Sequence, residues 1–133
     1  MTQLRISEVA GLLRVSDDTV RRWVEQGRLE TQLDGSGRMV VPGTSVAAFV
    51  RDRGHLDDDP RGHTVSARNR MAGIVTDVRR DGLVAQVEIQ AGPFRLVSLM
   101  TREAADELAL EPGALATAVV KATNVVVEAA DHR

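Results

Sequence analysis

Apolar residues recur with a helical period in the first half of the chain. Two sets stand at positions i, i+3 and i+4: Val9, Leu12 and Leu13, and then Val20, Trp23 and Val24. Residues at this spacing lie on one face of a helix. The pattern therefore predicts two short amphipathic helices, each with its apolar face turned toward a small core.

Local signals mark where these two helices begin and end. Ser7 and Ser16 are candidate N-caps, because a serine hydroxyl can accept a hydrogen bond from an N–H of the first turn. Gly27 is a candidate for the residue just past the second helix, where glycine is favoured. Only Arg14 and Val15 separate the helices, so we predict a helix-turn-helix.

A strand, a glycine-rich turn and a second strand are predicted next. The turn is Asp34-Gly35-Ser36-Gly37, and Arg38 stands just past it, so the hairpin forms a β-wing with a cation at its tip. Thr44 or Ser45 is expected to cap a third helix over residues 45–51. Its inward residues are expected to be Val46, Phe49 and Val50.

The second half of the chain changes to a strand period. Asp81-Gly82 and Gly92-Pro93 predict two tight turns between strands. Alternation places Leu83, Ala85, Val87 and Ile89 on one face before the second turn, and Phe94, Leu96 and Leu99 are expected to follow on a third strand. Thr101 is then expected to cap a short helix over residues 102–110, and residues 114–129 to form a closing strand.

This order of elements predicts an α+β chain of two small domains. Residues 1–51 would form a winged helix-turn-helix, and residues 65–133 a five-stranded OB-like β-barrel with one short helix. Residues 52–64 are acidic, contain Gly and Pro and have almost no apolar side chain, which predicts a flexible linker. Domains this small favour oligomerisation as a further source of buried surface.

Composition excludes several classes of function. The chain has 133 residues, a formal net charge of −2 and no cysteine, so disulfides and thiolate sites are absent. No apolar run is long enough for a membrane span and no signal peptide is visible, so a cytoplasmic location is expected. The two linker histidines lack a third ligand, so no cation site is expected. There is no nucleophile–base pair, carboxylate pair or phosphate loop, so we predict no catalytic residue and no enzyme.

The outward residues of the second helix include arginines that could contact DNA. The stretch ISEVAGLLRVSDDTVRRWVEQGRL followed by a wing resembles the MerR/excisionase type of winged helix-turn-helix over residues 3–51. The resemblance implies that the second helix enters the major groove while the wing arginine contacts the backbone or the minor groove. The residues that it assigns to DNA are Ser16, Thr19, Arg21, Arg22 and Arg38. A helical module for protein contacts is the alternative.

Charge limits how strongly one such domain would bind DNA. Residues 1–51 carry seven arginines and six acids, a net charge of +1, so the domain offers few phosphate contacts. Two copies held together would bind more tightly through their effective concentration. Residues 65–133 have a net charge of −1 and a single aromatic residue, which argues against a second nucleic-acid site there. The second half is therefore expected to hold several copies of the chain together.

Two stretches of the second half offer hydrogen-bond donors. SARNR (66–70) precedes the first predicted strand, and VVKATN (119–124) contains Lys121, the one lysine in a chain with sixteen arginines. Donors with one or two cations suit a tetrahedral dianion, which has only acceptor oxygens. The alternative is that the first stretch caps a strand edge while Lys121 extends to water.

The second half also resembles a known family. SARNRMAGIVTDV, VEI, SLMTREAADELALEPG and AVVKATNVVV are together similar to the Mop domain, a molybdate- or tungstate-binding domain of the TOBE type, from about Val65 to Glu128. The resemblance implies an oxyanion held between paired Mop units, hence a homodimer or hexamer. The implied ligands are Ser66, Ala67, Arg68, Asn69, Lys121, Ala122 and Thr123, with the two alanines acting through their backbone. Ala122 stands where the family often has serine.

Together these patterns predict a molybdate- or tungstate-responsive transcriptional regulator that binds double-stranded DNA and needs no organic cofactor. The first alternative is a cytoplasmic protein that stores or buffers molybdate and carries an accessory helical domain. The second is an excisionase-like architectural protein whose barrel serves only for oligomerisation.

Overall fold

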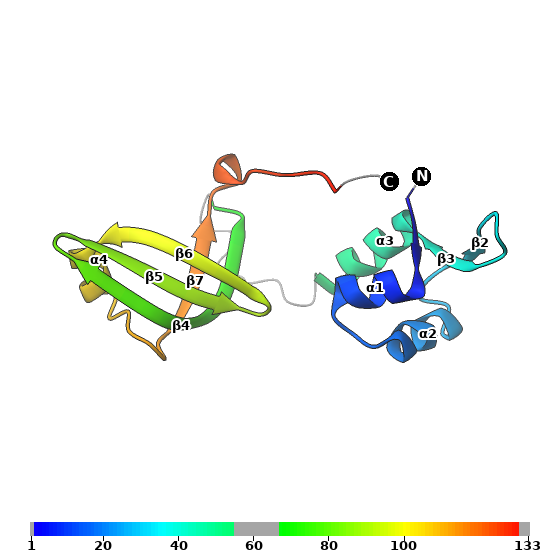
Figure 1. Cartoon of the computed structure of the whole chain (residues 1–133), viewed down its shortest axis with the longest axis horizontal. Coiled ribbons are helices and arrows are strands. Elements are labelled where there is room, and N and C mark those ends of the chain that lie inside the picture. The colour runs from blue at the N-terminus through cyan, green and yellow to red at the C-terminus, as the bar shows by residue number, and fades with distance from the viewer. Residues whose placement is uncertain (1, 55–66, 131–133) are drawn as a thin grey trace. The chain divides into compact units, whose positions relative to one another are not determined.

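The computed structural model describes residues 2–54 and 67–130. The chain divides into two compact units, Met1–Asp58 and Asp59–Arg133, each with its own core (Figure 1). The predicted linker, residues 52–64, lies mostly outside the described residues, and its flexibility stays a prediction. Within the described residues no helix is long and apolar enough to cross a membrane.

The first unit combines three helices with a small antiparallel sheet. Its elements are β1 (Gln3–Arg5), α1 (Ile6–Leu13), α2 (Asp17–Glu25), β2 (Gln32–Leu33), β3 (Met39–Pro42) and α3 (Gly43–Gly54). The sheet order is β1-β3-β2, so the wing hairpin is extended by a strand from the start of the chain. The predicted helix-turn-helix is therefore confirmed as α1 and α2, with the wing after them.

The core of this unit is built around its two aromatic side chains. The rings of Trp23 and Phe49 lie 4.7 Å apart between centroids, and Val9, Val20 and Val41 are fully buried around them. Aromatic pairs of this kind contribute about 0.5–1.5 kcal/mol beyond the area that they bury. The predicted inward face of α2 is thus confirmed for Val20 and Trp23.

Four predictions about α1 and α3 are wrong. Helix α3 spans Gly43–Gly54 and not residues 45–51, so Thr44 and Ser45 lie within the helix and do not cap it. The N-cap of α1 is Arg5 and not Ser7, because the chain passes directly from β1 into the helix and the Arg5 N–H donates to Glu8 Oε1 at 3.1 Å. The buried stripe of α1 is Ile6, Val9 and Ala10, and this rotation leaves Leu12 64% exposed. Val50 of α3 is 41% exposed, since Val46 and Phe49 occupy the inward face.

The second unit is an antiparallel sheet with one short helix. Its elements are β4 (Asn69–Asp81), β5 (Val84–Ala91), β6 (Phe94–Thr101), α4 (Arg102–Glu107), β7 (Leu115–Val120) and the 3₁₀ helix η3 (Ala122–Asn124). The strand order is β6-β5-β4-β7. Alternation along β5 buries its inward residues as predicted, and Val75, Val87, Ile89 and Leu110 form the core.

Three predictions for this unit need correction. Leu83 does not share the face of Ala85, Val87 and Ile89, because it lies in the turn with Gly82 and is exposed. Helix α4 ends at Glu107, three residues earlier than expected, and Ala109 turns the chain with φ 53°. Strand β7 ends at Val120, because the next residues turn into η3.

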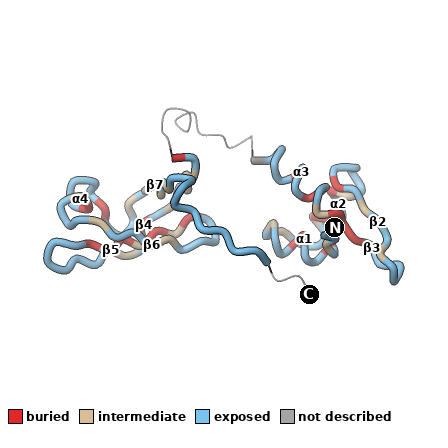
Figure 2. Tube along the Cα trace, turned by 90° about the horizontal axis from the view of Figure 1, so that it is seen from above, coloured by how far each residue is buried: buried red, intermediate tan, exposed pale blue. Residues whose placement is uncertain are grey.

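The predicted fifth strand and the closure of the barrel are not seen in the described sheet, which has four strands with β6 and β7 at its edges. Residues 125–130, which follow η3, are all exposed (Figure 2). The three valines among them include Val126, which is 94% exposed. Closure therefore stays a prediction.

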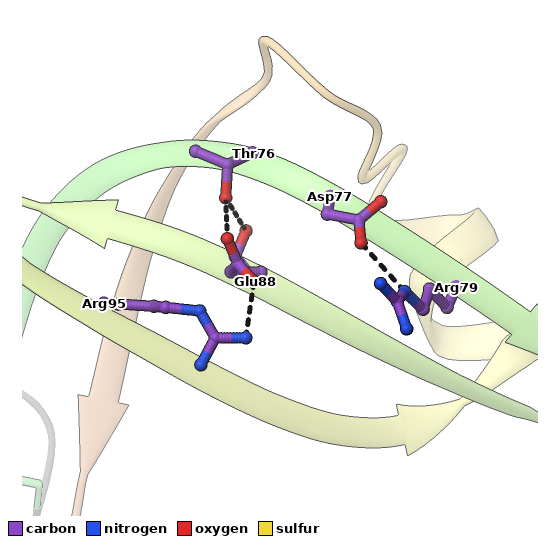
Figure 3. A network of polar contacts seen from close by, with 5 residues as sticks. All are labelled: Thr76, Asp77, Arg79, Glu88 and Arg95. Carbon is purple, nitrogen blue, oxygen red and sulfur yellow. Dashed lines mark hydrogen bonds and ion pairs between the residues drawn. The ribbon is translucent and has the colours of Figure 1, made fainter.

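The outer face of the sheet carries a cross-strand polar network (Figure 3). Glu88 on β5 accepts from Thr76 Oγ1 of β4 at 2.9 Å and pairs with Arg95 Nη2 of β6 at 2.6 Å. The hydrogen bond from Arg95 is the largest cause that lowers the pKa of Glu88, followed by the one from Thr76. Next to it, Arg79 Nε donates to Asp77 Oδ2 at 3.1 Å. The network links β4, β5 and β6.

Strand β4 changes partner near Gly73. Residues 69–74 pair with β7 and residues 74–81 pair with β5. A Cβ at Gly73 would lie 2.9 Å from the carbonyl carbon of Gln90 and closer still to its oxygen. Glycine therefore permits the close approach of β4 and β5 at the point where β4 passes from β7 to β5.

Candidate functional site

The two donor-bearing stretches of the second unit lie side by side in one chain. Asn69 pairs with Val120 and Arg70 with Val119 across the antiparallel ladder of β4 and β7. The Asn69 side chain adds a hydrogen bond, with Nδ2 donating to the Val120 carbonyl oxygen at 3.0 Å. Lys121 follows the paired residue directly, so the start of β4 and the end of β7 form one continuous surface.

The structure places the remaining predicted oxyanion ligands around this pair of strands. Ala67 is buried just before β4, and Arg68 is exposed beside it. The exposed Lys121, Ala122 and Thr123 form the turn after β7. Ser66 lies outside the described residues.

The turn after β7 is held by its own backbone. The Lys121 carbonyl oxygen accepts from the Asn124 N–H at 2.9 Å, and the Ala122 carbonyl oxygen accepts from the Val125 N–H at 3.3 Å. Lys121 itself is extended, with φ −64° and ψ 143°. The backbone at Lys121 is therefore fixed while its ammonium group is exposed, which suits a cation that donates to a bound ion.

The chemistry of this surface favours an anion over a cation. Arg68 and Lys121 supply charge and Asn69 supplies an amide, while carboxylates are absent from the two stretches. Among residues 2–54 and 67–130, no group of three or more His, Cys, Asp or Glu could hold a metal ion. Guanidinium, ammonium and N–H donors match a tetrahedral oxyanion, whose oxygens only accept.

The predicted DNA-contacting residues begin at the N-terminus of α2. Ser16 caps this helix, and its Oγ accepts from the Thr19 N–H at 3.1 Å. The Thr19 hydroxyl lies 2.9 Å from Ser16 Oγ and accepts from Arg22 Nη2 at 3.3 Å. Ser16 and Thr19 thus shape the helix start and orient Arg22.

Arg21 points along the exposed side of the same helix. Its Nη1 lies 3.3 Å from Asp18 Oδ1, and the two side chains are 58% and 94% exposed. An ion pair this exposed contributes at most about 1 kcal/mol, so the guanidinium can exchange Asp18 for a phosphate.

The wing arginine is positioned by a carboxylate at the base of the turn. Asp34 Oδ1 accepts from the N–H groups of Ser36 and Arg38, each at 2.9 Å, and Gly37 takes the positive φ of 77° that the turn requires. The hydrogen bond from the Arg38 N–H is the main cause that lowers the pKa of Asp34. The carboxylate fixes the backbone of Arg38 and leaves the side chain exposed.

Arg21 and Arg38 line one depression in the surface of the first unit. Arg5 lines the same depression, and sequence reasoning assigned it no role. In the sequence Arg5 is far from both other arginines, and the pairing of β1 with β3 brings it beside the wing strand that follows Arg38.

Comparisons with known proteins match the two units of the chain to two different families. A family model described as a TOBE domain matches residues 65–127, and one described as a helix-turn-helix domain matches residues 4–54. Both are binding domains, which confirms the prediction that the chain is not an enzyme.

Relatives with established descriptions match the second unit. Molybdenum-pterin-binding proteins 1 and 2 of Clostridium pasteurianum are 33% and 34% identical to it over 65 residues, which cover 48% of this chain and 96% of each relative. A solved structure of a molybdate-binding protein from Sporomusa ovata is 29% identical over 49% of this chain and 97% of its own, with a TM-score of 0.48.

Proposed function

This chain belongs to the TOBE-domain family of the clostridial molybdenum-pterin-binding proteins and joins that domain to a helix-turn-helix, and we propose that it is a cytoplasmic, molybdate- or tungstate-responsive regulator of transcription. The second unit binds the oxyanion and the first binds double-stranded DNA. The ligand is the bare oxyanion, without an organic cofactor.

The observation that carries this proposal is the register of β4 against β7. It brings Asn69 beside Val120 and therefore sets Arg68 and Lys121 at neighbouring strand ends. Two stretches that are distant in the sequence thus bring their donors to one place. The names of the relatives support molybdenum as the metal of the oxyanion.

Lys121 has a specific role in this site. Its ammonium group is a compact charge with three rotatable donors, whereas a guanidinium is planar and shaped for two parallel bonds. A cavity sized for a tetrahedral ion accommodates the first shape better. Ala67, Ala122 and their neighbours add backbone donors, and Ser66 and Thr123 add hydroxyl groups.

Assembly of several copies completes the proposed site. A cavity of about 430 Å³ separates the two edge strands, lined by Val97 and Met100 of β6 and by Leu115 and Val119 of β7. The exposed residues Leu99, Leu115 and Val126 are large and apolar. Exposed apolar patches and open sheet edges are typical of surfaces that other chains cover. In the proposed assembly a strand from a second copy is the fifth strand of each barrel.

The proposed response is a change of assembly on ligand binding. A ligand shifts an equilibrium only if it binds one arrangement more tightly, and an oxyanion enclosed between copies meets that condition. Native mass spectrometry of the full chain with and without molybdate tests this step. The same stoichiometry in both samples would refute the assembly mechanism and leave binding itself intact.

Titration calorimetry with molybdate, tungstate and sulfate tests the ligand. The proposal expects heat of binding with the first two ions and much weaker binding of sulfate, which is smaller. Absence of binding by all three ions would refute the oxyanion site and favour an architectural protein.

Storage of molybdate is the second candidate function. The match to the second unit spans almost the whole length of these relatives, so they contain little besides this domain. A gel shift with DNA from upstream of the protein's own operon separates the two functions, since only the regulator retards that DNA.

A further inference from the structure

A depression of about 450 Å³ lies where three parts of the first unit meet. Arg5 and Ser7 enter it from the start of α1, Arg21 from α2, and Arg38 from the wing. Asp17 is the single acidic residue among its lining residues. The depression thus gathers polar groups from segments that are distant in the sequence.

Positive charge is concentrated at this place. Three arginines and one aspartate line the depression, although residues 1–51 as a whole carry a net charge of only +1. The charges of Arg38 and Arg5 both contribute to lowering the pKa of Asp34, after the larger effects of the Arg38 and Ser36 N–H groups. The charges of both arginines therefore act on the carboxylate that holds the wing turn.

The backbones of these arginines are held while their charged groups remain available. The N–H of Arg5 is engaged by Glu8 and the N–H of Arg38 by Asp34. Across residues 2–54 and 67–130, the ion pairs include neither the Arg5 nor the Arg38 guanidinium. Arg21 has only its exposed pair with Asp18. All three guanidinium groups can therefore turn toward an external anion.

We propose that this depression binds a backbone phosphate of double-stranded DNA, and that Arg5 is one of its contacts. The inference rests on the proposed DNA-binding function and adds a residue to it. The Ser7 hydroxyl and the first-turn N–H groups of α1 supply neutral donors, as helix N-termini do for phosphates. One phosphate held by α1, α2 and the wing fixes the angle at which α2 meets the major groove.

The test measures binding of a mixed-sequence DNA duplex to the full chain by fluorescence anisotropy over a range of salt concentrations. A phosphate contact contributes equally to all sequences, so Arg5→Gln is expected to weaken binding to two unrelated duplexes alike. Removal of one such contact reduces the slope of log affinity against log salt by about one. Arg5→Lys, which keeps the charge, is expected to retain most of that slope.

The matched control is Arg51→Gln, which removes the same charge from an exposed residue of α3 that lines a different depression. It is expected to change the slope little. Equal effects of Arg5→Gln and Arg51→Gln would overturn the inference, provided that Trp23 fluorescence shows both variants folded. A wild-type chain that binds no duplex at low salt would overturn the proposed function and this inference with it.

Discussion

Asn69 lies opposite Val120 in the β4–β7 ladder, and its side-chain Nδ2 donates to the Val120 carbonyl oxygen at 3.0 Å. One side chain thus joins the two stretches that supply the proposed oxyanion ligands. The bond holds the carbonyl group of the last residue before Lys121, so it helps to place the backbone from which the Lys121 side chain extends.

Asn69→Ala should therefore weaken molybdate binding as well as stability. Loss of one side-chain hydrogen bond costs about 1 kcal/mol of unfolding free energy, measurable by calorimetric unfolding. Gln90→Ala is the control, because Gln90 Nε2 donates to the Gly92 carbonyl oxygen at 3.0 Å in the same unit. Titration should show weaker molybdate binding only for Asn69→Ala, and equal affinities of both variants would argue against the site.

Lys121→Arg should keep the fold and weaken molybdate binding. The side chain is exposed, so the substitution does not alter the core. The guanidinium cannot donate from the position of the ammonium, and loss of a charge-assisted hydrogen bond costs about 1.5 kcal/mol of binding free energy. Titration calorimetry is expected to show an affinity roughly tenfold lower. Arg102→Lys, an exchange of cations on α4, should leave the affinity unchanged. Unaltered binding by Lys121→Arg would remove the proposed role of the ammonium group.

Two Gly→Ala substitutions should have opposite effects. At Gly73 the new Cβ meets the backbone of Gln90, and overpacking of this kind costs about 1–3 kcal/mol. A Cβ at Gly11 in α1 would have no atom within 4 Å apart from the adjacent residues and the backbone of its own helix, so alanine should stabilise the helix by about 0.5–1 kcal/mol. Calorimetry measures the first effect and Trp23 fluorescence in denaturant the second. A neutral result at Gly73 would show that β4 and β5 can separate there.

The wing should lose stability in acid through Asp34. Its pKa lies below the ordinary value of 3.8, mainly because the Arg38 N–H donates to it. A lowered folded-state pKa gives stability that is present above 3.8 and is lost as the pH falls through the folded value. Trp23 fluorescence in denaturant measures the free energy of unfolding. The wild type should be more stable than Asp34→Ala above pH 3.8, and this difference should shrink as the pH falls through the folded-state pKa. Parallel pH profiles of the two proteins would contradict this.

Features determined by neighbouring residues were predictable from the sequence. Ser16 and Thr101 cap their helices and residues 34–37 form the wing turn, as their types and spacing indicated. These contacts span few positions, so a short stretch of sequence contains both partners.

Features that depend on contacts between distant segments were not predictable in the same way. Periodicity showed that Leu12 belongs to an apolar set but not which part of the helix faces the core. The valines after η3 have high strand propensity, yet propensity does not supply the neighbouring strand that a ladder needs. The meeting of Asn69 with Val120 within one chain was not predicted, because the family resemblance implied donors that meet between paired units. Arg5 gave no local signal, because its neighbours Arg21 and Arg38 come from other elements.

The open edges of the sheet have a consequence for the living cell. If neighbouring copies cover the cavity between β6 and β7, the folded form gains stability from mass action and becomes dependent on how many molecules are present. The threshold at which the oxyanion produces a response would then rise and fall with expression of the gene itself. Autoregulation of its own promoter would change the sensitivity of the sensor as well as its amount.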